Sequence, residues 1–467
     1  MTRWLIVTSY AVLGSVLVWS HLARLGGAYC CDEIKTVTEY INRGPRTILA
    51  GPYVPNDHQL FNLLGWTTTS LVGDSPLALR LWSAIPFLLG VLVVTAWLHR
   101  RVGGISGVVF LFLATLSPLL LDITRMARGY GLAFLAMSVL TVCAFEAERD
   151  GRTRALVGFT IAGLVGSLTL PHFSIAFAAT AAALLARPDL RLRVLVGMAA
   201  SGIAILAWYA PHLDDIASTS LGEYGLDIQT RWLITAPIDQ TLVPAMTLLD
   251  DSFVRPSAAS LAAAAVFAVL MGSSPLLRQR RPALILCSGV VATVAAFWLT
   301  DTSVVPRFFS FLLVPLFILV ATGSESIVAR ERRGYASVRG VLVAVTIMAI
   351  AVLSVPFLRE VPRLPRDSGS AVALTIRSVV PPSTPVFAHL AYPRDLAFHL
   401  GRPVRSSWTS REAAEVCSVR RLAVYVDQPY LVPKADVPCT RRADVRHYHF
   451  EQYARGRQID VWVIPAS

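Results

Sequence analysis

Long apolar runs separated by short polar segments recur over the first three quarters of the chain. A spanning helix requires about 20 apolar residues, and these runs predict about eleven spans. The predicted spans are 4–25, 77–98, 105–121, 130–146, 155–171, 174–187, 194–210, 257–275, 283–300, 308–322 and 340–357. The first run is too long for a secretion signal and lacks a clear small-residue cleavage site, so we interpret it as a retained span. The chain is predicted to be a mainly α, polytopic membrane protein.

Composition and charge agree with this interpretation. The chain is 54% hydrophobic and 15% charged, whereas soluble domains carry about 25% charged residues. The net charge of +12 comes almost entirely from Arg, because Lys occurs only at Lys35 and Lys434. The positive charges form clusters between spans rather than one stripe, which argues against a nucleic-acid partner.

The Arg-rich clusters predict the orientation in the membrane. They lie at 99–101, 146–154, 187–193, 278–281 and 330–339. Lys and Arg accumulate on cytoplasmic loops, and alternating spans place every cluster on that side. We therefore expect a bacterial cytoplasmic (inner) membrane protein with its N-terminus inside and its C-terminus outside.

This topology leaves several long segments outside. The first, 26–76, contains two stretches that are expected to lie along the membrane surface, 32–43 and 57–72. In the second stretch Leu60, Leu63, Leu64 and Leu71 share one helical face, as in an interfacial helix. The segment 211–256 is also too long for a simple connection.

The composition changes after the last span, which separates a membrane module over 1–357 from a polar, Pro-rich region over 358–467. This region alternates short strand-like runs with helical stretches, so we predict a small extracytoplasmic α/β domain. The predicted strands are 386–390, 421–426, 445–450 and 459–464, and the predicted helices are 371–380 and 411–416.

The six cysteines divide between membrane and outside. Cys143 and Cys287 fall in spans and are expected to be apolar packing residues. Cys417 and Cys439 lie in the outer domain, where a disulfide would persist and would contribute about 3 kcal/mol. The adjacent Cys30 and Cys31 pair with each other only under strain. A metal site is the alternative, but no tetrahedral ligand spacing is found.

An acidic pair, Asp32 and Glu33, directly follows the first span. Carboxylates at a membrane surface cost free energy unless they are paired or used. On a helix the two would point about 100° apart, so one can face a site while the other faces solvent or a partner. The alternative is a helix N-terminus, where the helix dipole favours acidic residues.

A second polar cluster opens an apolar helix and consists of Asn56, Asp57, His58 and Gln59. Asn56 or Asp57 alone is explained as an N-cap. That explanation leaves His58 and Gln59 without a role.

Basic residues form the third and fourth signals. Asp122, Arg125 and Arg128 are spaced by three and would share a face of a helix. A phosphate would satisfy both guanidinium groups with bidentate hydrogen bonds; Asp122 alone would neutralise one of them. Arg307 precedes a late span, where a single Arg is usually an interfacial anchor.

Taken in order, these motifs resemble the GT-C glycosyltransferases, in the branch of protein O-mannosyltransferases and aminoarabinose and arabinose transferases (glycosyltransferase family 39-like). The residues that carry the resemblance are Asp32-Glu33, Asn56 to Phe61, Ser75 to Gly103, Leu116 to Tyr130 and Pro306-Arg307-Phe308. Asp57 and Gln59 depart from the commoner pattern of the second motif. The similarity covers about residues 1–330 and is only architectural beyond 360.

The resemblance implies a polyprenyl-phosphate sugar as donor, of the mannose or arabinose class, and an extracytoplasmic glycan, lipid or protein as acceptor. A phosphate leaving group needs cationic stabilisation, which is assigned to Arg128 and Arg307, with Arg125 and Lys35. Asp32 is the expected general base, and Glu33 orients the acceptor or pairs with a cation. Asn56, Asp57, His58, Tyr130 and His172 are expected to bind the acceptor or the sugar. No cofactor is expected.

Two other classes of protein were weighed. A transporter or flippase of lipid-linked sugars would carry ionisable groups near the bilayer midplane, whereas the polar residues here gather at the outer ends of the spans. A structural or receptor-like protein would explain the outer domain but not the loop motifs.

Overall fold

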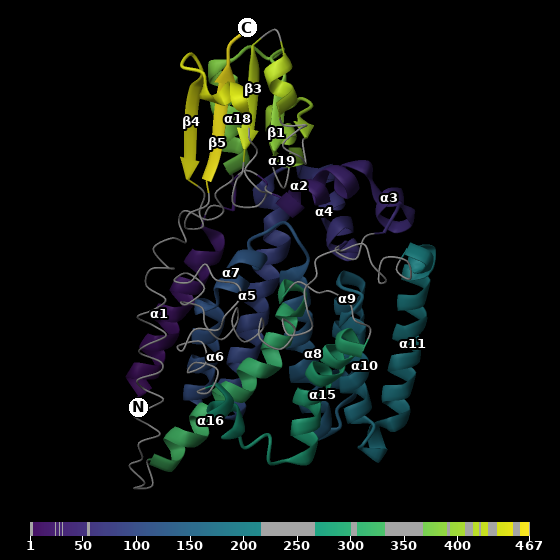
Figure 1. Cartoon of the computed structure of the whole chain (residues 1–467). Coiled ribbons are helices and arrows are strands. Elements are labelled where there is room, and N and C mark those ends of the chain that lie inside the picture. The colour runs from purple at the N-terminus through teal and green to yellow at the C-terminus, as the bar shows by residue number, and fades with distance from the viewer. Residues whose placement is uncertain are drawn as a thin grey trace. The chain divides into compact units, whose positions relative to one another are not determined.

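The computed structural model describes residues 3–215, 267–299, 306–331 and 368–466, with short gaps at 24, 28, 30, 54–56, 390–392, 407–413, 420–421, 428–436 and 452–457. The chain divides into two compact units. The first unit comprises Met1–Leu25 and Thr38–Pro362, and the second comprises Gly26–Val37 and Arg363–Ser467. The segment Gly26–Val37, which the sequence assigns to the membrane module, thus belongs to the second unit (Figure 1).

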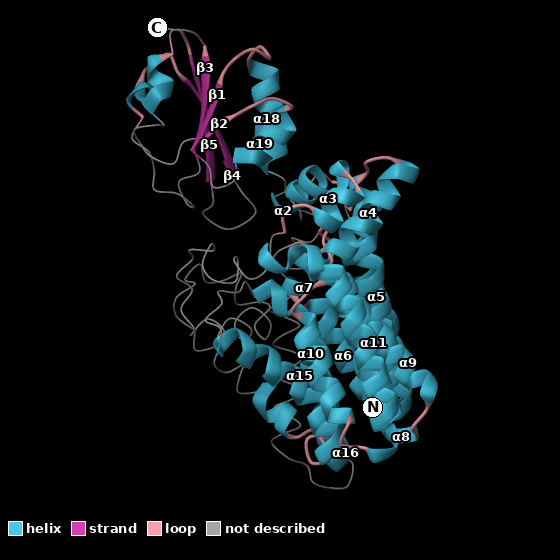
Figure 2. Ribbon diagram, turned by 90° about the vertical axis from the view of Figure 1, so that its right-hand side faces the viewer, coloured by secondary structure: helices cyan, strands magenta, loops and turns pink. Residues whose placement is uncertain are grey.

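The first unit is a bundle of apolar helices (Figures 1 and 2). They are α1 (Arg3–Leu22), α5 (Pro76–Arg101), α6 (Gly104–Leu116), α7 (Pro118–Thr124), α8 (Tyr130–Asp150), α9 (Thr153–Thr169), α10 (Phe173–Leu184), α11 (Arg191–Tyr209), α15 (Arg280–Leu299) and α16 (Leu313–Glu331). Six segments of the described chain are long and apolar enough to cross a membrane, within α1, α5, α8 and α15 and around α11 and α16. The shorter α6, α9 and α10 also coincide with predicted spans.

Two predicted spans are less fully described. The span 340–357 lies outside the described residues, and 257–275 is described only from Phe267 onward. Most of the remaining predicted spans each coincide with one helix, because a run of about 20 apolar residues is a strong signal for a spanning helix. The predicted span 105–121 is divided between α6 and α7, and 308–322 begins in the 3₁₀ helix Pro306–Leu312 and continues into α16.

Successive helices of the bundle run in opposite directions, and this gives it two chemically different ends (Figure 1). We call the end where α5, α8 and α10 finish, and where α9, α11 and α15 begin, the Arg-rich end. The opposite end, where α5 and α8 begin and α9 and α11 finish, is called the site end. Helices α5 and α8 pack closely against each other: a Cβ on Gly131 of α8 would lie 1.9 Å from the Ser83 carbonyl oxygen of α5.

Two further helices, α3 (Pro45–Ala50) and α4 (Gln59–Val72), belong to the first predicted outer segment. Helix α4 buries Gln59, Phe61, Asn62 and Gly65. Leu71, on the predicted apolar face, is 79% exposed. Leu60, Leu63 and Leu64 are half-buried. The buried face of α4 thus combines Phe61 with the polar side chains of Gln59 and Asn62.

The second unit contains a five-stranded sheet. Its strands are β1 (Val386–His389), β2 (Arg405–Ser406), β3 (Ala423–Asp427), β4 (Arg446–Glu451) and β5 (Gln458–Ile464), in the order β2-β1-β3-β5-β4. Strands β2, β1 and β3 are parallel, and β3, β5 and β4 pair antiparallel. Helices α18 (Ser368–Val379) and α19 (Pro393–Leu400) pack on one face with Ile376 and Leu396 in a buried core.

The opposite face of this sheet is covered by two short 3₁₀ helices, Ala414–Ser418 and Pro438–Arg441. The sulfur atoms of Cys417 and Cys439 form a disulfide between them, with Cα atoms 5.5 Å apart. All four predicted strands are present within one or two residues of their predicted ends. The sequence missed β2 and α19, and the predicted helix 411–416 is a 3₁₀ turn in its described part.

Candidate active site

The turn 125–129 at the site end carries both arginines of the third motif. Helix α7 ends at Thr124, so Arg125 and Arg128 lie beyond it, and the predicted helical face shared with Asp122 is wrong. Both arginines are buried, each 3% exposed, whereas Asp122 is exposed. One guanidinium nitrogen of Arg125, Nη2, donates to the Ala23 carbonyl oxygen at 2.6 Å.

The bend of this turn depends on Gly129. A Cβ at this position would lie 2.5 Å from Thr169 Cγ2 and 2.9 Å from His58 Nδ1. Any larger residue would therefore push the turn away from the end of α9 and from the start of α4. Gly129 is what allows α8 to begin directly beside the histidine.

His58 and Tyr130 meet at this point. Their ring centroids are 4.6 Å apart and the rings are nearly perpendicular. His58 is the N-cap of α4 but makes no side-chain capping bond. Asp57 accepts a short hydrogen bond from Asn62 Nδ2 instead. The capping role offered for Asp57 is therefore wrong, and Asn56 lies outside the described residues.

A second set of hydrogen bonds links the start of α4 and the segment before it to the residues that follow α11. Gln59 Nε2 donates to the Ile48 carbonyl oxygen at 2.9 Å and to His212 Nε2 at 2.7 Å. The Tyr53 amide donates to Asp215 Oδ2 at 2.9 Å. These bonds hold Tyr53 and Gln59 against the residues that follow α11. They also give Gln59 the role that an N-cap explanation had left open.

His172, in the turn between α9 and α10, is placed in an aromatic environment. Its Nε2–H donates to the Phe308 carbonyl oxygen at 2.9 Å. Rings of Phe297, Phe308 and Phe311 each lie 5.7 Å from it. This burial lowers the pKa of His172 to about 4. The imidazole is thus neutral, and it anchors the 3₁₀ helix Pro306–Leu312 that contains Arg307.

The acidic pair belongs to the second unit and lies on α2 (Cys31–Lys35). Glu33 is fully buried, whereas Asp32 and Lys35 are half-buried. The backbone just before α2 is held by α19, because His399 Nε2 donates to the Tyr29 carbonyl oxygen at 3.0 Å and Phe398 packs edge-on against Tyr29. The sequence gave no sign of this support, since α19 was not predicted.

The structure brings some of the predicted site residues together. Within the first unit, His58 and Tyr130 adjoin Gly129 in the turn that carries Arg125 and Arg128, while His172 contacts the Phe308 backbone. Asp57 precedes His58 and bonds to Asn62. The side chain of Arg307 lies outside the described residues. Across the described ranges, no group of three His, Cys, Asp or Glu side chains is suited to holding a metal ion. The site end therefore places a histidine and a tyrosine at the turn that carries two buried arginines.

Apolar helices of spanning length, with a small α/β unit attached, define a multi-pass membrane protein. No protein-family model and no curated protein matches the chain. Solved structures do.

The chain matches the crystal structure of ArnT from Cupriavidus metallidurans in the apo state with a TM-score of 0.55 and 15% identity, over 98% of this chain and 97% of that one. It matches ArnT from the same organism bound to undecaprenyl phosphate with a TM-score of 0.52 and 15% identity, over 99% and 98%. The chain therefore has the fold of this ArnT over nearly its whole length, which confirms the predicted mainly α, polytopic membrane architecture.

Proposed function

We propose that this protein is an inverting glycosyltransferase that moves a sugar of the mannose or arabinose class from a polyprenyl-phosphate donor to an extracytoplasmic glycan, lipid or protein. The observation that carries the proposal is the burial of Arg125 and Arg128 at the site end of a membrane bundle. Burying a guanidinium group costs free energy unless a partner compensates its charge. A phosphate on a membrane lipid is an anion suited to such a site.

The fold comparison supports the same donor chemistry. ArnT is an aminoarabinose transferase, and one of its structures holds undecaprenyl phosphate. Departure of a sugar from a polyprenyl phosphate leaves negative charge on the phosphate, so cations placed there stabilise the transition state. We assign Arg128 and Arg125 to this role, together with Arg307 and Lys35.

The acceptor hydroxyl needs a base, for which we propose Asp32. Being half-buried, Asp32 is accessible to a substrate, whereas the fully buried Glu33 is better suited to orienting or pairing. Attack from the side opposite the phosphate inverts the anomeric centre. Asp57, His58 and Tyr130 bind the acceptor or the sugar, and His172 acts by holding the backbone of Phe308.

We also propose that the site end faces outward and the Arg-rich end faces the cytoplasm, as positive charge predicts. A cysteine introduced at Thr153, which begins α9 at the Arg-rich end, should be labelled only from inside. A cysteine at Asn56 should be labelled only from outside. Labelling of both from one side would contradict the orientation.

Asp32→Asn tests the proposed function. It keeps the size of the side chain but removes the base, so turnover with a polyprenyl-phosphate sugar should fall by about two to four orders of magnitude while donor binding is retained. Asp189→Asn, at the Arg-rich end, is the control and should behave as the parent. Turnover of Asp32→Asn within about threefold of the parent, far short of the loss of a general base, would remove Asp32 from this role.

A further inference from the structure

The sheet of the second unit has a point where the chain diverges. Strands β1 and β3 are neighbours and run parallel. After β1 the chain continues through α19 to β2, whereas after β3 it continues through the 3₁₀ helix Pro438–Arg441 to β4, at the opposite edge of the sheet. Helix α19 and this 3₁₀ helix also cover opposite faces (Figure 2). In open sheets with parallel strands, ligands bind outside the carboxyl ends of strands whose connections diverge in this way.

Ionisable side chains lie at this point of divergence. His389 and Asp427 are the last residues of β1 and β3, and they are paired in register. Asp460 of β5 is in register with Asp427, so the three side chains form one row on one face of the sheet. They are 2%, 1% and 8% exposed, in that order along the chain. Burying ionisable side chains costs free energy, so packing alone does not explain a row of three.

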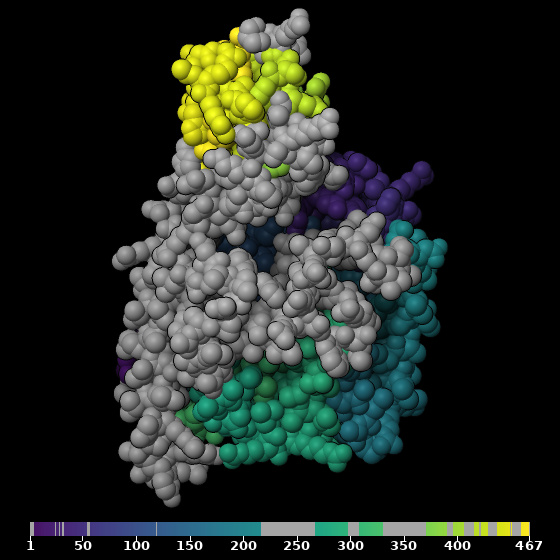
Figure 3. Space-filling view, viewed as in Figure 1, coloured from purple at the N-terminus to yellow at the C-terminus, as the bar shows by residue number. Residues whose placement is uncertain are grey.

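An aromatic row lies directly beside this one on the same face. The rings of Tyr425 and Trp462 stack with centroids 5.4 Å apart, and those of Trp462 and His447 stack at 4.9 Å. His447 Nε2–H donates to Asp460 Oδ1 at 2.9 Å, which connects the two rows. The side chain of Asp460 is 12% exposed and that of His447 is 48% exposed. The rows therefore open to solvent toward β4, and Figure 3 shows the yellow segments that include β4 and β5 at the surface.

The hydroxyl group of Tyr425 adds a buried hydrogen-bond donor. Tyr425 is 1% exposed, and its hydroxyl oxygen has no hydrogen-bond partner among the described residues. Burial raises the pKa of Tyr425, and the charge of Asp427 raises it further, so the phenol stays protonated beside that carboxylate. A buried donor without an acceptor costs free energy. A ligand that brings an acceptor would remove this cost.

The two rows together suit a polyhydroxylated ligand. Ionised carboxylates only accept hydrogen bonds, so Asp427 and Asp460 can accept from hydroxyl groups, while Tyr425 can donate to one. Each sugar hydroxyl both donates and accepts. The half-buried Trp462 offers an aromatic surface beside these groups. A metal ion fits less well, because no three His, Cys, Asp or Glu side chains in the described part of the chain are placed to hold one.

We propose that the carboxyl ends of β1 and β3 form a binding site for a sugar unit of a neutral glycan chain. Asp427 and Asp460 accept hydrogen bonds from its hydroxyl groups, and Tyr425 donates one to it. His447 is a positioning residue, because its hydrogen bond holds the Asp460 carboxylate. The choice of a glycan rests on the proposed function, in which an extracytoplasmic glycan is one of the acceptors. The site belongs to the second unit, whereas Arg125 and Arg128 belong to the first.

The first test is the affinity of the full-length protein in detergent for neutral oligosaccharides of mannose, arabinose, galactose and glucose, measured by saturation-transfer NMR. Tyr425→Phe keeps the ring that stacks on Trp462 but removes the hydroxyl group. Its affinity should fall by about three- to tenfold, as for the loss of one neutral hydrogen bond. Its unfolding midpoint without glycan should not fall, because the hydroxyl has no partner among the described residues.

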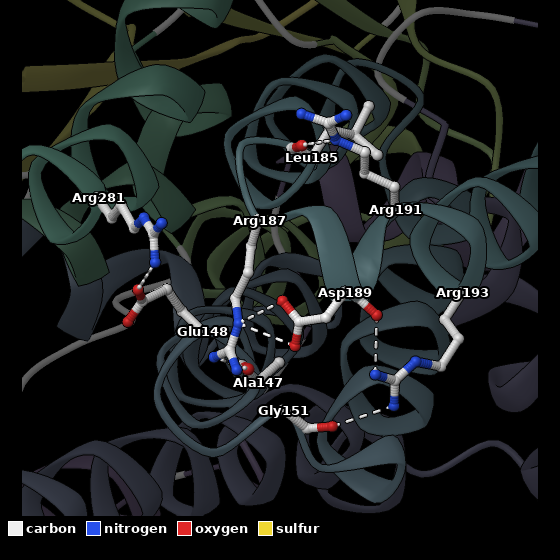
Figure 4. Close-up of polar contacts among 9 residues, drawn as sticks. All are labelled: Ala147, Glu148, Gly151, Leu185, Arg187, Asp189, Arg191, Arg193 and Arg281. Carbon is white, nitrogen blue, oxygen red and sulfur yellow. Dashed lines mark hydrogen bonds and ion pairs between the residues drawn. The ribbon is translucent and has the colours of Figure 1, made fainter.

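The second test uses Asp427→Asn, which removes a charged acceptor at nearly constant size. Its affinity should fall by about ten- to a hundredfold, as for the loss of a hydrogen bond to a charged group. Two matched controls make the same change at exposed ion pairs. Asp444 pairs with Arg442 at 2.6 Å in the second unit, and Asp189 pairs with Arg187 at 2.9 Å in the first (Figure 4). Asp444→Asn and Asp189→Asn should bind within about twofold of the parent.

The site would be overturned by a parent that binds none of the oligosaccharides, or by Tyr425→Phe and Asp427→Asn variants that bind as the parent does. An equal loss in the two controls would replace the site with a general effect of charge. A lower unfolding midpoint of Tyr425→Phe would assign its hydroxyl group to the fold instead. Failure of the proposed function is distinguishable, because a parent that binds oligosaccharide but transfers no sugar contradicts that function and leaves the site intact.

Discussion

The two ends of the membrane bundle use arginine in opposite ways. At the site end, Arg80 is fully buried, and Arg125 and Arg128 are each 3% exposed. Arg80 Nη1 donates to the Leu25 carbonyl oxygen at 2.9 Å, and Arg125 also bonds to a carbonyl. At the Arg-rich end, the side chain of Arg101 is 32% exposed and forms two hydrogen bonds with the Glu146 carboxylate.

This difference distinguishes an arginine that binds a ligand or supports the fold from an arginine that sets the orientation of the protein in the membrane. Burying a guanidinium group costs several kcal/mol before compensation, so a buried arginine at a membrane surface indicates either an anionic ligand or a structural task. An exposed arginine paired with a carboxylate costs little and contributes little. In the proposed orientation, it still favours the cytoplasmic side for its loop. Arginine therefore indicates a ligand site or a structural role at the site end, and membrane orientation at the Arg-rich end.

The largest expected effect is at Arg128. Arg128→Ala removes a cation from the proposed phosphate site, so kcat/KM for the donor should fall by about two to three orders of magnitude, with weaker donor binding. Arg101→Ala, at the Arg-rich end, should stay within about twofold of the parent, as expected for an exposed pair. Equal effects of the two substitutions on kcat/KM would erase the contrast between the ends.

Arg80→Leu should lower the free energy of unfolding rather than the rate of the chemical step. The change takes a donor from the Leu25 carbonyl oxygen inside the first unit, at a cost of about 1–3 kcal/mol. Thermal unfolding in detergent measures this loss. A variant at least as stable as the parent would show that the buried charge of Arg80 is not structural.

The half-buried His172 adds a pH dependence that the exposed pairs of the Arg-rich end lack. The pKa of His172 is lowered to about 4 by burial, against about 6.5 in the unfolded chain. Above pH 6.5 both states are neutral and nothing is gained or lost. As pH falls, the unfolded state binds the proton first, so stability should decrease by about 2 kcal/mol between pH 7 and pH 5.

His172→Gln can still donate to the Phe308 carbonyl oxygen but does not titrate. Its unfolding free energy, measured at both pH values, should show a smaller decrease than that of the parent, by about the 2 kcal/mol that His172 contributes. The same acid sensitivity in both proteins would place the titrating group elsewhere.

The smallest effect is expected at the pair Arg101 and Glu146. Breaking it with Glu146→Gln should cost about 0.2–1 kcal/mol, and the cost should shrink further at high salt. Chemical denaturation at two salt concentrations measures both. A loss above about 2 kcal/mol would mean that the pair is more than an exposed contact.

The sequence predicts the spans and most of the sheet because each depends on a local pattern. Apolar runs set the spans. The β5 strand, Gln458–Ile464, buries Ile459, Val461 and Val463 at a spacing of two residues. Strand β2 is only two residues long, and α19 has a mixed composition with no long apolar stripe, so neither has a comparable signal.

The candidate site could be predicted only in part, because its geometry depends on contacts that are distant in the sequence. A spacing of three predicted a shared helical face for Arg125 and Arg128, but α7 ends at Thr124, and the turn that carries both arginines approaches His58 and Thr169 at Gly129. The bond between Gln59 and His212 joins positions 153 residues apart. No local pattern reports such a bond.

Under the proposed function, a sugar leaves its polyprenyl phosphate at the site end. The most direct measurement uses the parent and Arg128→Ala in proteoliposomes with an isotopically labelled polyprenyl-phosphate sugar and a cell-envelope fraction as acceptor. The parent should release one polyprenyl phosphate for each sugar transferred, with inversion at the anomeric carbon, and Arg128→Ala should lose both products together. Label that crosses the bilayer while still attached to its polyprenyl phosphate, with none released, would rule out the glycosyltransferase and identify a transporter.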